Sequence, residues 1–279
     1  MKLIAFIQMF NEVEKGNLER CLINCKKWSD DIVIYDDAST DDSVKLGQKY
    51  TNHILRGSKN EISRELYHKQ ELLDYAIKNI SPTHIMWIDC DEILDRSGTK
   101  DAMVDLCNVM DKNDLDCMAF HELNLWRGQN WCRTDSLFDI GWFNRLWKVR
   151  DNITFQCEVG VHKRIYPITI SDNKIQRSNI RVIHYGFYNY EKMLIKIGVK
   201  QIGANQGIVN DWQRVLIDIY TENWILNETE LNVYEVPESI FPEENIPKER
   251  TSKPVPFTYK TVEDVERYAN NYNWDKHGF

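Results

Sequence analysis

The chain has 279 residues, of which 42% are hydrophobic and 28% are charged, and its formal net charge at pH 7 is −8. This length can bury a full core and suits one large α/β domain with an appendage better than two equal domains. Because binding to a phosphate backbone needs dense Lys and Arg, the acidic balance argues against nucleic acid as a partner. A small anion held by a bound divalent cation stays compatible with it.

The composition also bears on the compartment. No stretch approaches the run of about 18 apolar residues that spans a bilayer. The first residues lead into a strand-like segment without a signal-cleavage pattern, so we expect a cytoplasmic protein with no transmembrane segment. The seven cysteines are scattered and include no CxxC pair. This predicts reduced thiols, not a disulfide framework or a structural zinc site.

The first hundred residues alternate strand-like and helix-like segments, the pattern of a mostly parallel sheet with crossover helices. Apolar runs predict strands at 2–9, 31–35, 53–55 and 84–88, and helical spacing predicts helices at 17–28, 43–50 and 66–77. The fourth strand stops at Asp89. Carboxylates are therefore expected at the carboxyl end of a strand, where open α/β sheets bind ligands.

From residue 116 to 170 the pattern becomes β-rich and aromatic, with tryptophans at 126, 131, 142 and 147. These rings are interpreted either as core and sheet packing or as a stacking wall for an acceptor sugar. Helical spacing returns from Tyr190 and again around 212–224. Five of the seven prolines lie between Pro237 and Pro256, which predicts an extended arm or linker there.

The strongest local signal is the segment Trp87-Ile88-Asp89-Cys90-Asp91-Glu92, in which an apolar strand delivers two carboxylates one residue apart. Carboxylate oxygens are the hard ligands that Mg²⁺ and Mn²⁺ prefer, and such a metal can bridge a diphosphate. A metal there can act as a Lewis acid that stabilises a departing diphosphate. The alternative interpretation is an acidic pair that caps the next helix or stays solvated.

The second strand also ends in an acidic pair, Asp36-Asp37. An Asp at this edge can accept hydrogen bonds from a pyrimidine or a ribose hydroxyl. The alternative is a turn before a helix whose N-cap is Ser39 or Thr40. Both interpretations are compatible with each other.

Four features in order, the Asn11-Glu12 pair, the helix at 17–28, the segment 32–41 and the segment 88–92, resemble the nucleotide-binding half of family 2 glycosyltransferases. The resemblance covers residues 3–92 and implies the glycosyltransferase A-type fold. It implies metal and diphosphate binding by Asp89 and Asp91, with His184 as an additional metal ligand or, alternatively, a hydrogen-bonded core residue. The donor-binding residues that we derive with it are Gln8, Asn11, Glu12, Asp36, Asp37, Arg64, Lys69, Asp89 and Cys90.

Within that set, Lys69-Gln70 occupies the place of a polar pair that the family carries in the helix before the fourth strand, and Arg64 lies about one turn earlier. These cations either face the donor phosphates or sugar, or belong to a solvated helix face.

The second half resembles the branch that includes bacterial lipopolysaccharide-core glucosyltransferases, through Arg145-Leu-Trp-Lys148, Val161-His162-Lys163 and residues 182–187. That branch has a Glu where this chain has Lys163. An inverting transfer needs a general base near the acceptor hydroxyl. We expect Glu158 in this role, with His162 second and Asp139 third; a surface ion pair is the alternative role of Glu158.

The predicted fold is α/β: a Rossmann-like mixed central sheet flanked by helices, followed by C-terminal helices and a proline-rich arm. The expected organisation is a nucleotide-sugar half (1–110), an acceptor half (111–205) and a C-terminal region (206–279). The predicted function is sugar transfer, with Mn²⁺ or Mg²⁺, from a nucleotide-diphosphate donor, UDP-sugar favoured, to a hydroxyl of a glycan acceptor. The resemblance implies inversion and a role in glycan or polysaccharide synthesis, and the arm is a candidate surface for homo-oligomers.

Two other classes stay open. A haloacid-dehalogenase-type phosphatase would use Asp89 as nucleophile and Asp91 as acid/base, although its motif opens the fold and a later Gly-Asp-x-x-x-Asp segment is missing here. A non-catalytic carbohydrate-binding protein would keep the fold and use the tryptophans. A sugar nucleotidyltransferase or a P-loop protein is disfavoured because no Gly-rich loop follows the first strand.

Overall fold

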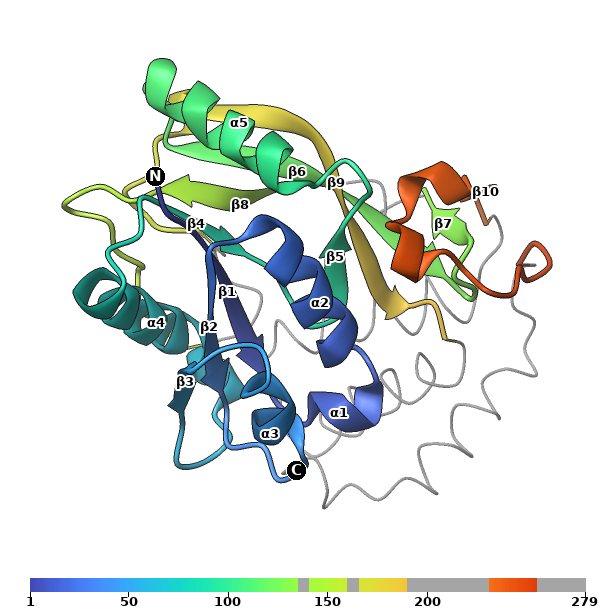
Figure 1. The fold of residues 1–279 in the computed structure, drawn as a ribbon, viewed down its shortest axis with the longest axis horizontal. Helices are drawn as coiled ribbons and strands as arrows, with labels where there is room; N and C mark the ends of the chain where they lie inside the picture. The colour runs from blue at the N-terminus through green and yellow to red at the C-terminus, as the bar shows by residue number, and fades with distance from the viewer. Residues whose placement is uncertain (135–140, 160–165, 190–230, 255–279) are drawn as a thin grey trace. The chain divides into compact units, whose positions relative to one another are not determined.

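The computed structural model describes residues 1–134, 141–159, 166–189 and 231–254 (Figure 1). The chain divides into two units. The sheet unit comprises residues 1–123, 141–184 and 239–246, and the second unit comprises 124–140, 185–238 and 247–279. The predicted domain limits at residues 110 and 205 stay predictions.

The sheet unit is built on a mixed sheet with four parallel strands, ordered β4-β1-β2-β3. Their bounds are β1 (Leu3–Met9), β2 (Asp31–Asp36), β3 (His53–Arg56) and β4 (His84–Trp87). The sheet continues from β4 with antiparallel β8 (Trp142–Lys148) and then β6 (Cys117–Trp126). A short strand, β5 (Glu92–Leu94), pairs antiparallel with β9 (Ile175–Phe187).

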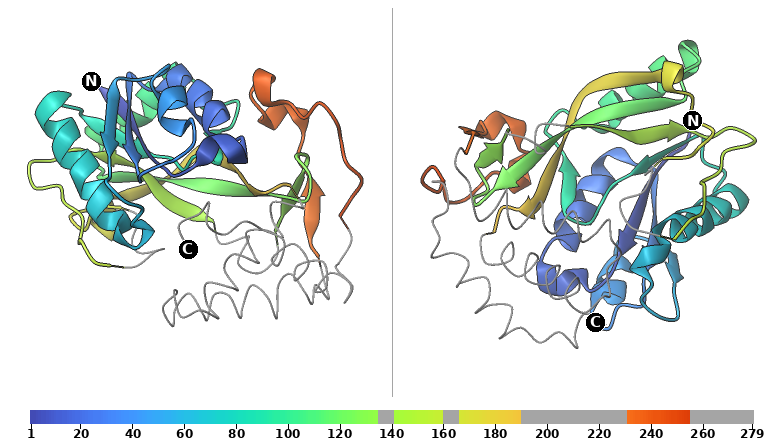
Figure 2. Two further views of the ribbon diagram at one scale, coloured as in Figure 1. Left: turned by 90° about the horizontal axis from the view of Figure 1, so that it is seen from below. Right: turned by 180° about the vertical axis from the view of Figure 1, so that it is seen from behind.

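Helices cover both faces of this sheet (Figure 2). On one face α2 (Leu18–Trp28) and α5 (Lys100–Lys112) contribute to one hydrophobic core, and on the other face α4 (Glu65–Asn79) contributes to a second. Alternate residues of β1 serve the two cores: Leu3, Ala5 and Ile7 the first, Ile4 and Phe6 the second. The mixed central sheet flanked by helices confirms the predicted fold class.

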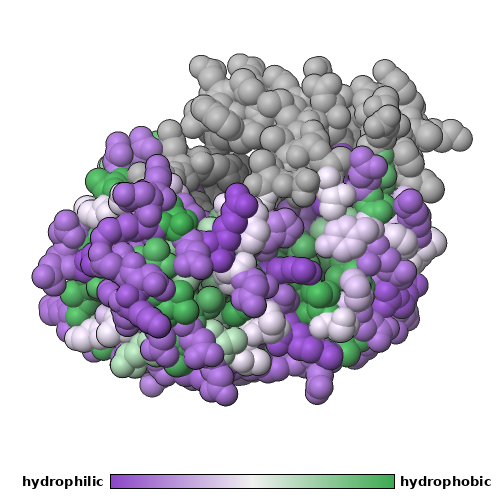
Figure 3. Space-filling view, turned by 90° about the horizontal axis from the view of Figure 1, so that it is seen from above, coloured by the Kyte–Doolittle hydropathy of each residue, from purple (hydrophilic) through white to green (hydrophobic). Residues whose placement is uncertain are grey.

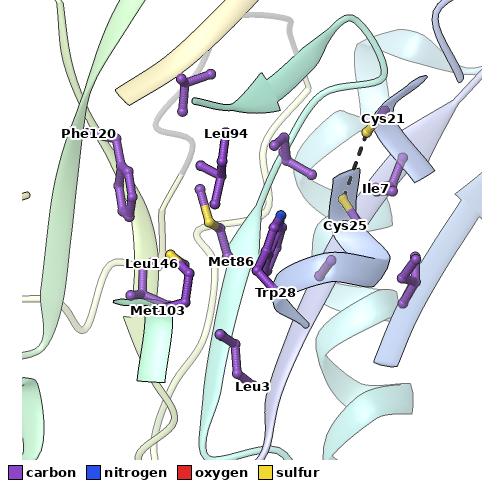
Figure 4. Packing of buried hydrophobic residues seen from close by; sticks show 14 of the residues in the cluster. Leu3, Ile7, Cys21, Cys25, Trp28, Met86, Leu94, Met103, Phe120 and Leu146 are labelled. Atoms are coloured by element: carbon purple, nitrogen blue, oxygen red, sulfur yellow. Dashed lines mark hydrogen bonds between the residues drawn. The ribbon is translucent and has the colours of Figure 1, made fainter. Parts of the chain in front are cut away.

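The first core shows why the helical stripe of α2 folds as predicted. Its apolar positions Leu18, Cys21, Leu22, Cys25 and Trp28 are all buried. Figure 4 shows the Trp28 ring packed among side chains of the strands and of α5. The residues of this core that are labelled in the figure include Leu3, Met86, Leu94, Met103, Phe120 and Leu146. An unbroken apolar face at helical spacing therefore sets this helix against the sheet.

Three short helical segments lie beside the long ones: α1 (Glu12–Lys15), α3 (Ser43–Gly47) and the 3-10 turn η1 (Ile62–Arg64). The predicted helix at 43–50 ends earlier, at Gly47. There the Thr51 N–H donates to the Gly47 carbonyl at 3.1 Å, and the Thr51 hydroxyl donates to the Ile32 carbonyl at 2.6 Å. The hydroxyl bond ties Thr51 to β2, two residues before β3 begins at His53.

The described part of the second unit contains β7 (Trp131–Arg133), which pairs antiparallel with the end of β6 and with β10 (Val233–Glu235).

The proline-rich segment is more structured than a linker, since 3-10 turns η5 (Glu238–Ile240) and η6 (Glu243–Asn245) follow β10 and Phe241 is fully buried. Another 3-10 turn, η3 (Asp172–Lys174), precedes β9. The helices predicted from Tyr190 and at 212–224 lie outside the described residues.

The tryptophans differ in burial, and their interpretation as a stacking wall for an acceptor sugar stays a prediction. Trp126 and Trp147 are fully buried, whereas Trp142 is 37% exposed. All seven cysteines fall within the described residues, none of them forms a disulfide bond there, and six of them are buried. The face in Figure 3 mixes hydrophilic side chains with smaller hydrophobic patches. Of the helices described, none has the length and apolar character to cross a membrane.

Candidate active site

Three neighbouring parallel strands end at one edge of the sheet unit. The register pairs Met9 of β1 with Asp36 of β2, and the Asp37 N–H donates to the Met9 carbonyl at 2.9 Å. Beyond β4, the Cys90 thiol donates to the Gln8 carbonyl at 3.3 Å. The chain segments that carry Gln8, Asp37 and the Asp89–Asp91 pair are therefore joined at the carboxyl ends of the strands, where α/β sheets bind ligands.

Asp36 and Asn11 shape the loop after β2. Asp36 is fully buried, and its carboxylate accepts the Ser39 N–H at 3.2 Å and pairs with Arg56 Nε at 3.1 Å. Asn11 has a left-handed backbone (φ 48°), and its side-chain oxygen accepts the Thr40 N–H at 2.8 Å. These two predicted donor-site residues thus hold protein backbone in place.

Asp37 is the first residue after β2, at the start of this loop, and it is 1% exposed. Its Oδ1 accepts the Glu61 N–H at 3.0 Å, and its Oδ2 accepts from Asn60 Nδ2 at 3.3 Å. Burial raises the pKa of Asp37, although the bond from the Glu61 backbone opposes the shift. The structure therefore fixes the orientation of this carboxylate.

Gln8 is held from one side only. Its Nε2 lies 3.0 Å from His68 Nδ1, and its Oε1 is buried without a hydrogen-bond partner among the described residues. His68 stacks on Tyr35 with ring centroids 4.1 Å apart and planes 13° apart. Burial lowers the pKa of His68 to about 4, so the neutral ring accepts from the Gln8 amide. A carbonyl oxygen that can accept a ligand N–H is left at the strand edge.

The acidic turn after β4 is held by its own hydrogen bonds. The Asp89 N–H donates to Glu92 Oε2 at 2.8 Å, and the Trp87 indole Nε1 donates to Asp89 Oδ1 at 2.8 Å. The Asp89 side chain nevertheless stays 49% exposed. Its orientation is therefore fixed while part of the carboxylate faces outward.

Arg145 of β8 lies behind this turn and is 4% exposed. Its guanidinium contacts Asp89 Oδ2 at 3.3 Å, Glu92 Oε1 at 2.5 Å and Glu122 Oε2 at 3.2 Å. Burial raises the pKa of Glu92 to about 8; Arg145 opposes this, while the charges of Asp89 and Glu122 add to it. The Arg145 guanidinium thus forms ion pairs with three carboxylates.

His184 of β9 stands opposite Glu92 in the β5–β9 pair. Its Nε2 lies 3.3 Å from Asp91 Oδ2, and its Nδ1 lies 3.3 Å from Glu122 Oε1. Although burial disfavours the charged ring, Asp91 and Glu122 raise the pKa of His184 to about 10. Burial likewise opposes the ionised form of Glu122, yet His184 and Arg145 lower its pKa to about 2.

The predicted metal ligands are only partly assembled. Among the residues the structure describes, no group of three or more His, Cys, Asp or Glu side chains is arranged to hold a metal ion. Asp91 Oδ2 and His184 Nε2 do lie 3.3 Å apart, and Asp89 has its own contacts with Trp87 and Arg145. Carboxylate oxygens and an imidazole nitrogen suit a divalent ion such as Mn²⁺, so the donor chemistry fits.

The other predicted donor residues are occupied by protein contacts. Lys69 is fully buried and pairs with Glu65 at 2.5 Å. Arg64 lies over the Tyr67 ring at 4.7 Å, and Glu12 pairs with Lys15 at 2.6 Å. Cys90 is 5% exposed, and burial raises the pKa of its thiol well above the ordinary value.

The first candidate base, Glu158, is exposed. The segment before it is anchored on α4, because the Phe155 N–H donates to Gln70 Oε1 at 2.8 Å and the Cys157 thiol donates to the Leu66 carbonyl at 3.7 Å. Glu158 thus follows a segment fixed along the first turns of α4. His162 and Asp139 lie outside the described residues.

Four residues of this edge were not singled out as site residues from the sequence: His68, Glu92, Glu122 and Arg145. Glu92 directly follows the Asp-x-Asp pair, and Glu122 interrupts an otherwise mostly apolar strand, CMAFHELNLW. A buried charged side chain in an apolar strand is rare without a partner. That pattern is the signal that could have found Glu122.

Comparisons with known proteins find a family match for part of the chain. Residues 5–120 match the family described as Glycosyl transferase family 2. No curated protein matches the chain significantly. Among solved structures, the chain is similar to residues 1–349 of S. aureus TarS, with 13% identity, a TM-score of 0.46, and coverage of 82% of this chain and 76% of that chain.

Two further similar structures carry ligands. S. aureus TarS 1–349 in complex with UDP is 18% identical, with a TM-score of 0.32 and coverage of 46% of this chain. The mannosyltransferase PcManGT from Pyrobaculum calidifontis in complex with GDP-Man and Mn²⁺ is 13% identical, with a TM-score of 0.34 and coverage of 43% of this chain. The chain spans 36% and 35% of the lengths of these two proteins.

Proposed function

We propose that this chain, whose residues 5–120 match the model of Glycosyl transferase family 2, transfers a sugar from a nucleotide-diphosphate donor to a hydroxyl group of an acceptor. The observation that carries the proposal is the meeting, at one sheet edge, of fixed hydrogen-bond acceptors and an acidic turn. Gln8 and Asp37 supply the acceptors, and Asp89 and Asp91 form the turn. The two sets lie within the family segment.

The nucleoside part of the donor is assigned to Gln8 and Asp37. The Gln8 Oε1 has no hydrogen-bond partner among the described side chains and backbone, and the Asp37 carboxylate is oriented by Glu61 and Asn60. Both offer acceptors, which suit the N–H groups of a base and the hydroxyls of a ribose. A uracil imide offers one such N–H, so UDP is the favoured nucleotide.

The diphosphate part is assigned to a divalent ion, Mn²⁺ or Mg²⁺, that Asp89, Asp91 and His184 would hold. When bound, the ion supplies Lewis-acid stabilisation of the charge that develops on the departing diphosphate. The chain's own part is to fix the donor atoms: Trp87 and Arg145 orient Asp89, and Glu122 orients His184. Preorganised groups of this kind need no rearrangement during the reaction.

The transfer itself needs a base on the acceptor side. We assign Glu158, with His162 as the second candidate. The Glu158 carboxylate accepts the proton of the acceptor hydroxyl. At the same time, the oxygen of that hydroxyl forms a bond to the anomeric carbon of the donor sugar. The bond between that carbon and the diphosphate oxygen breaks on the opposite side, which gives inversion. The nucleoside diphosphate leaves with the electron pair of the broken bond.

Calorimetric titration with UDP, GDP, CDP and ADP, each with and without Mn²⁺, tests the donor site. We expect one nucleotide to bind more tightly with Mn²⁺, and Asp91→Asn to remove the effect of the metal. Asp114→Asn is the matched control, because Asp114 pairs with Arg150 and Lys174 at the surface. Failure of the native protein to bind any nucleotide with either condition contradicts the proposal.

The base assignment is tested separately with Glu158→Gln and His162→Gln. Loss of sugar transfer with unchanged nucleotide binding is expected for the residue that acts as base. If both variants turn over like the native protein with its donor and acceptor, neither residue is the base.

A further inference from the structure

Glu122 of β6 lies between the two cations of the acidic edge. Its Oε2 is 3.2 Å from Arg145 NH2, and its Oε1 is 3.3 Å from His184 Nδ1. Each cation in turn reaches one member of the Asp-x-Asp pair: Arg145 reaches Asp89, and His184 reaches Asp91, both at 3.3 Å. A continuous chain of charged contacts therefore runs from Asp89 through Glu122 to Asp91.

The contact with His184 has a specific chemical consequence. A histidine that binds a metal through one ring nitrogen commonly donates its other N–H to a carboxylate, which fixes the ring orientation. Here Nδ1 faces Glu122, and Nε2 faces Asp91. Nε2 would hold a metal after giving up the proton that it shares with Asp91, the carboxylate that would hold the same ion.

The contact with Arg145 extends this effect to Asp89. A guanidinium is planar and presents its donors in a rigid fork, so partners on different N–H groups are held at a set separation. Arg145 NH2 is shared by Glu92 and Glu122, while NH1 faces Asp89. Glu122 is 8% exposed and Arg145 is 4% exposed, so solvent screens these contacts little.

A purely stabilising role explains the arrangement less well. Burying charges carries a large desolvation penalty, and buried ion pairs often add no net stability over apolar residues of similar volume. Glu122 lies in a strand whose neighbours are mostly apolar and buried. An apolar side chain would fill the position, yet it could not orient His184.

We propose that Glu122 is a positioning residue of the donor site, which aims His184 Nε2 at Asp91 and, through Arg145, holds Asp89 beside it for a shared divalent ion. The inference rests on the proposed function for the identity of the ion. It concerns the geometry of the ligands, and Glu122 itself does not contact the donor.

The experiment measures Mn²⁺ binding to the full chain by electron paramagnetic resonance, without nucleotide. In Glu122→Met, which keeps the approximate volume but offers no oxygen acceptor, we expect the affinity to fall by about 10- to 100-fold. Glu122→Gln keeps an oxygen that can accept from Nδ1, so its affinity should fall less. Asp116→Asn is the matched control, since Asp116 is a buried carboxylate just before β6 that pairs with Arg150 at 2.6 Å.

A spectroscopic readout separates positioning from a structural role. Electron spin-echo modulation detects an imidazole nitrogen bound to Mn²⁺, and we expect this signal in the native protein and in Asp116→Asn. It should disappear in Glu122→Met at Mn²⁺ concentrations that refill the site. Arg145→Lys is a second route if Glu122→Met does not fold, because it keeps the charge but removes the fork, and it should also weaken Mn²⁺ binding.

The outcomes distinguish the two proposals. Unchanged Mn²⁺ affinity and nitrogen modulation in Glu122→Met, or unchanged affinity in Arg145→Lys where the first variant does not fold, overturn the role of Glu122 and leave the glycosyltransferase proposal intact. A native protein that binds neither Mn²⁺ nor any nucleotide diphosphate overturns both.

Discussion

The ammonium of Lys69 lies 4.0 Å from the ring centroid of Trp87, although Lys69 is a residue of α4 and Trp87 ends β4. Both side chains are almost fully buried. The same indole donates its N–H to Asp89 Oδ1. A cation over the ring face is an attractive interaction that is stronger where water is excluded. Lys69 therefore acts on the acidic turn through Trp87, and its ammonium is paired with Glu65 within α4.

This relationship predicts the effect of Trp87→Phe. The substitution keeps an aromatic ring under Lys69 and removes the hydrogen bond to Asp89. A hydrogen bond to a charged group contributes about 1.5–3 kcal/mol, so we expect the Mn²⁺-dependent part of nucleotide binding to fall by roughly tenfold. Calorimetry with the preferred nucleotide measures it.

The control for that substitution is Trp28→Phe. Trp28 is also a fully buried tryptophan whose Nε1 donates a hydrogen bond, to Asn24 Oδ1 at 3.1 Å, but it lies in α2. Trp28→Phe should lower the free energy of unfolding without changing the effect of Mn²⁺ on nucleotide binding. Equal binding losses in the two variants would contradict a specific role of the Trp87 indole.

The fold and the acidic motif could be predicted because they depend on local patterns. β1 and β2 are mostly apolar, and α2 has one apolar stripe, so each element follows from its own residues. Residues 5–120 match the model of Glycosyl transferase family 2, the family that the sequence motifs resemble. The lipopolysaccharide-core branch stays a prediction.

The cation network could not be predicted in the same way. Arg145 meets Glu92 and Glu122 across 53 and 23 residues of sequence. Glu122 lies on β6, whose pairing with β8 shifts its register between Met118 and Ala119. A one-residue shift decides which side chains face each other. Nothing in the local sequence of β8 sets that shift, so the partners of Arg145 emerge only from the assembled sheet.

The core packing predicts a large effect of Ile7→Ala on stability. Ile7 of β1 is fully buried in the core to which α2 contributes. Truncation of a buried Ile to Ala lowers the free energy of unfolding by about 2–5 kcal/mol. The midpoint of urea unfolding should fall accordingly. Ile77→Ala is the control, because Ile77 of α4 is 43% exposed and its truncation should change the unfolding free energy by less than about 1 kcal/mol.

Asn11 allows its backbone and side-chain contributions to be separated. Its φ of 48° favours Asn or Gly over Ala, and its side chain holds the Thr40 N–H. Both substitutions remove the side-chain hydrogen bonds, which include those from the Thr40 and Asp41 N–H groups, and Asn11→Ala also adds backbone strain of about 1–2 kcal/mol. Urea unfolding of the two variants should therefore rank Ala below Gly, and equal stabilities would argue against strain at this position.

The buried neutral His68 predicts a loss of stability in mild acid. Its pKa is about 4 in the folded chain and about 6.5 in an unfolded chain. Between these values the unfolded state binds more protons, so the contribution of His68 is complete above about pH 6.5 and is lost as the pH falls toward 4. Linkage gives a loss of about 2 kcal/mol between pH 7 and pH 5 from this one residue.

His68→Phe tests this origin of the acid sensitivity, since it keeps a ring to stack on Tyr35 and cannot bind a proton. Unfolding by urea at pH 7 and pH 5 gives the acid loss for each protein. We expect the loss to shrink by about 2 kcal/mol in the variant. His84, whose pKa burial also lowers to about 4, keeps its share in both proteins. An unchanged acid loss in His68→Phe would mean that the His68 ring is protonated at pH 5 in the folded chain as well as in the unfolded one. A ring protonated on both nitrogens contradicts the hydrogen bond in which its Nδ1 accepts from Gln8.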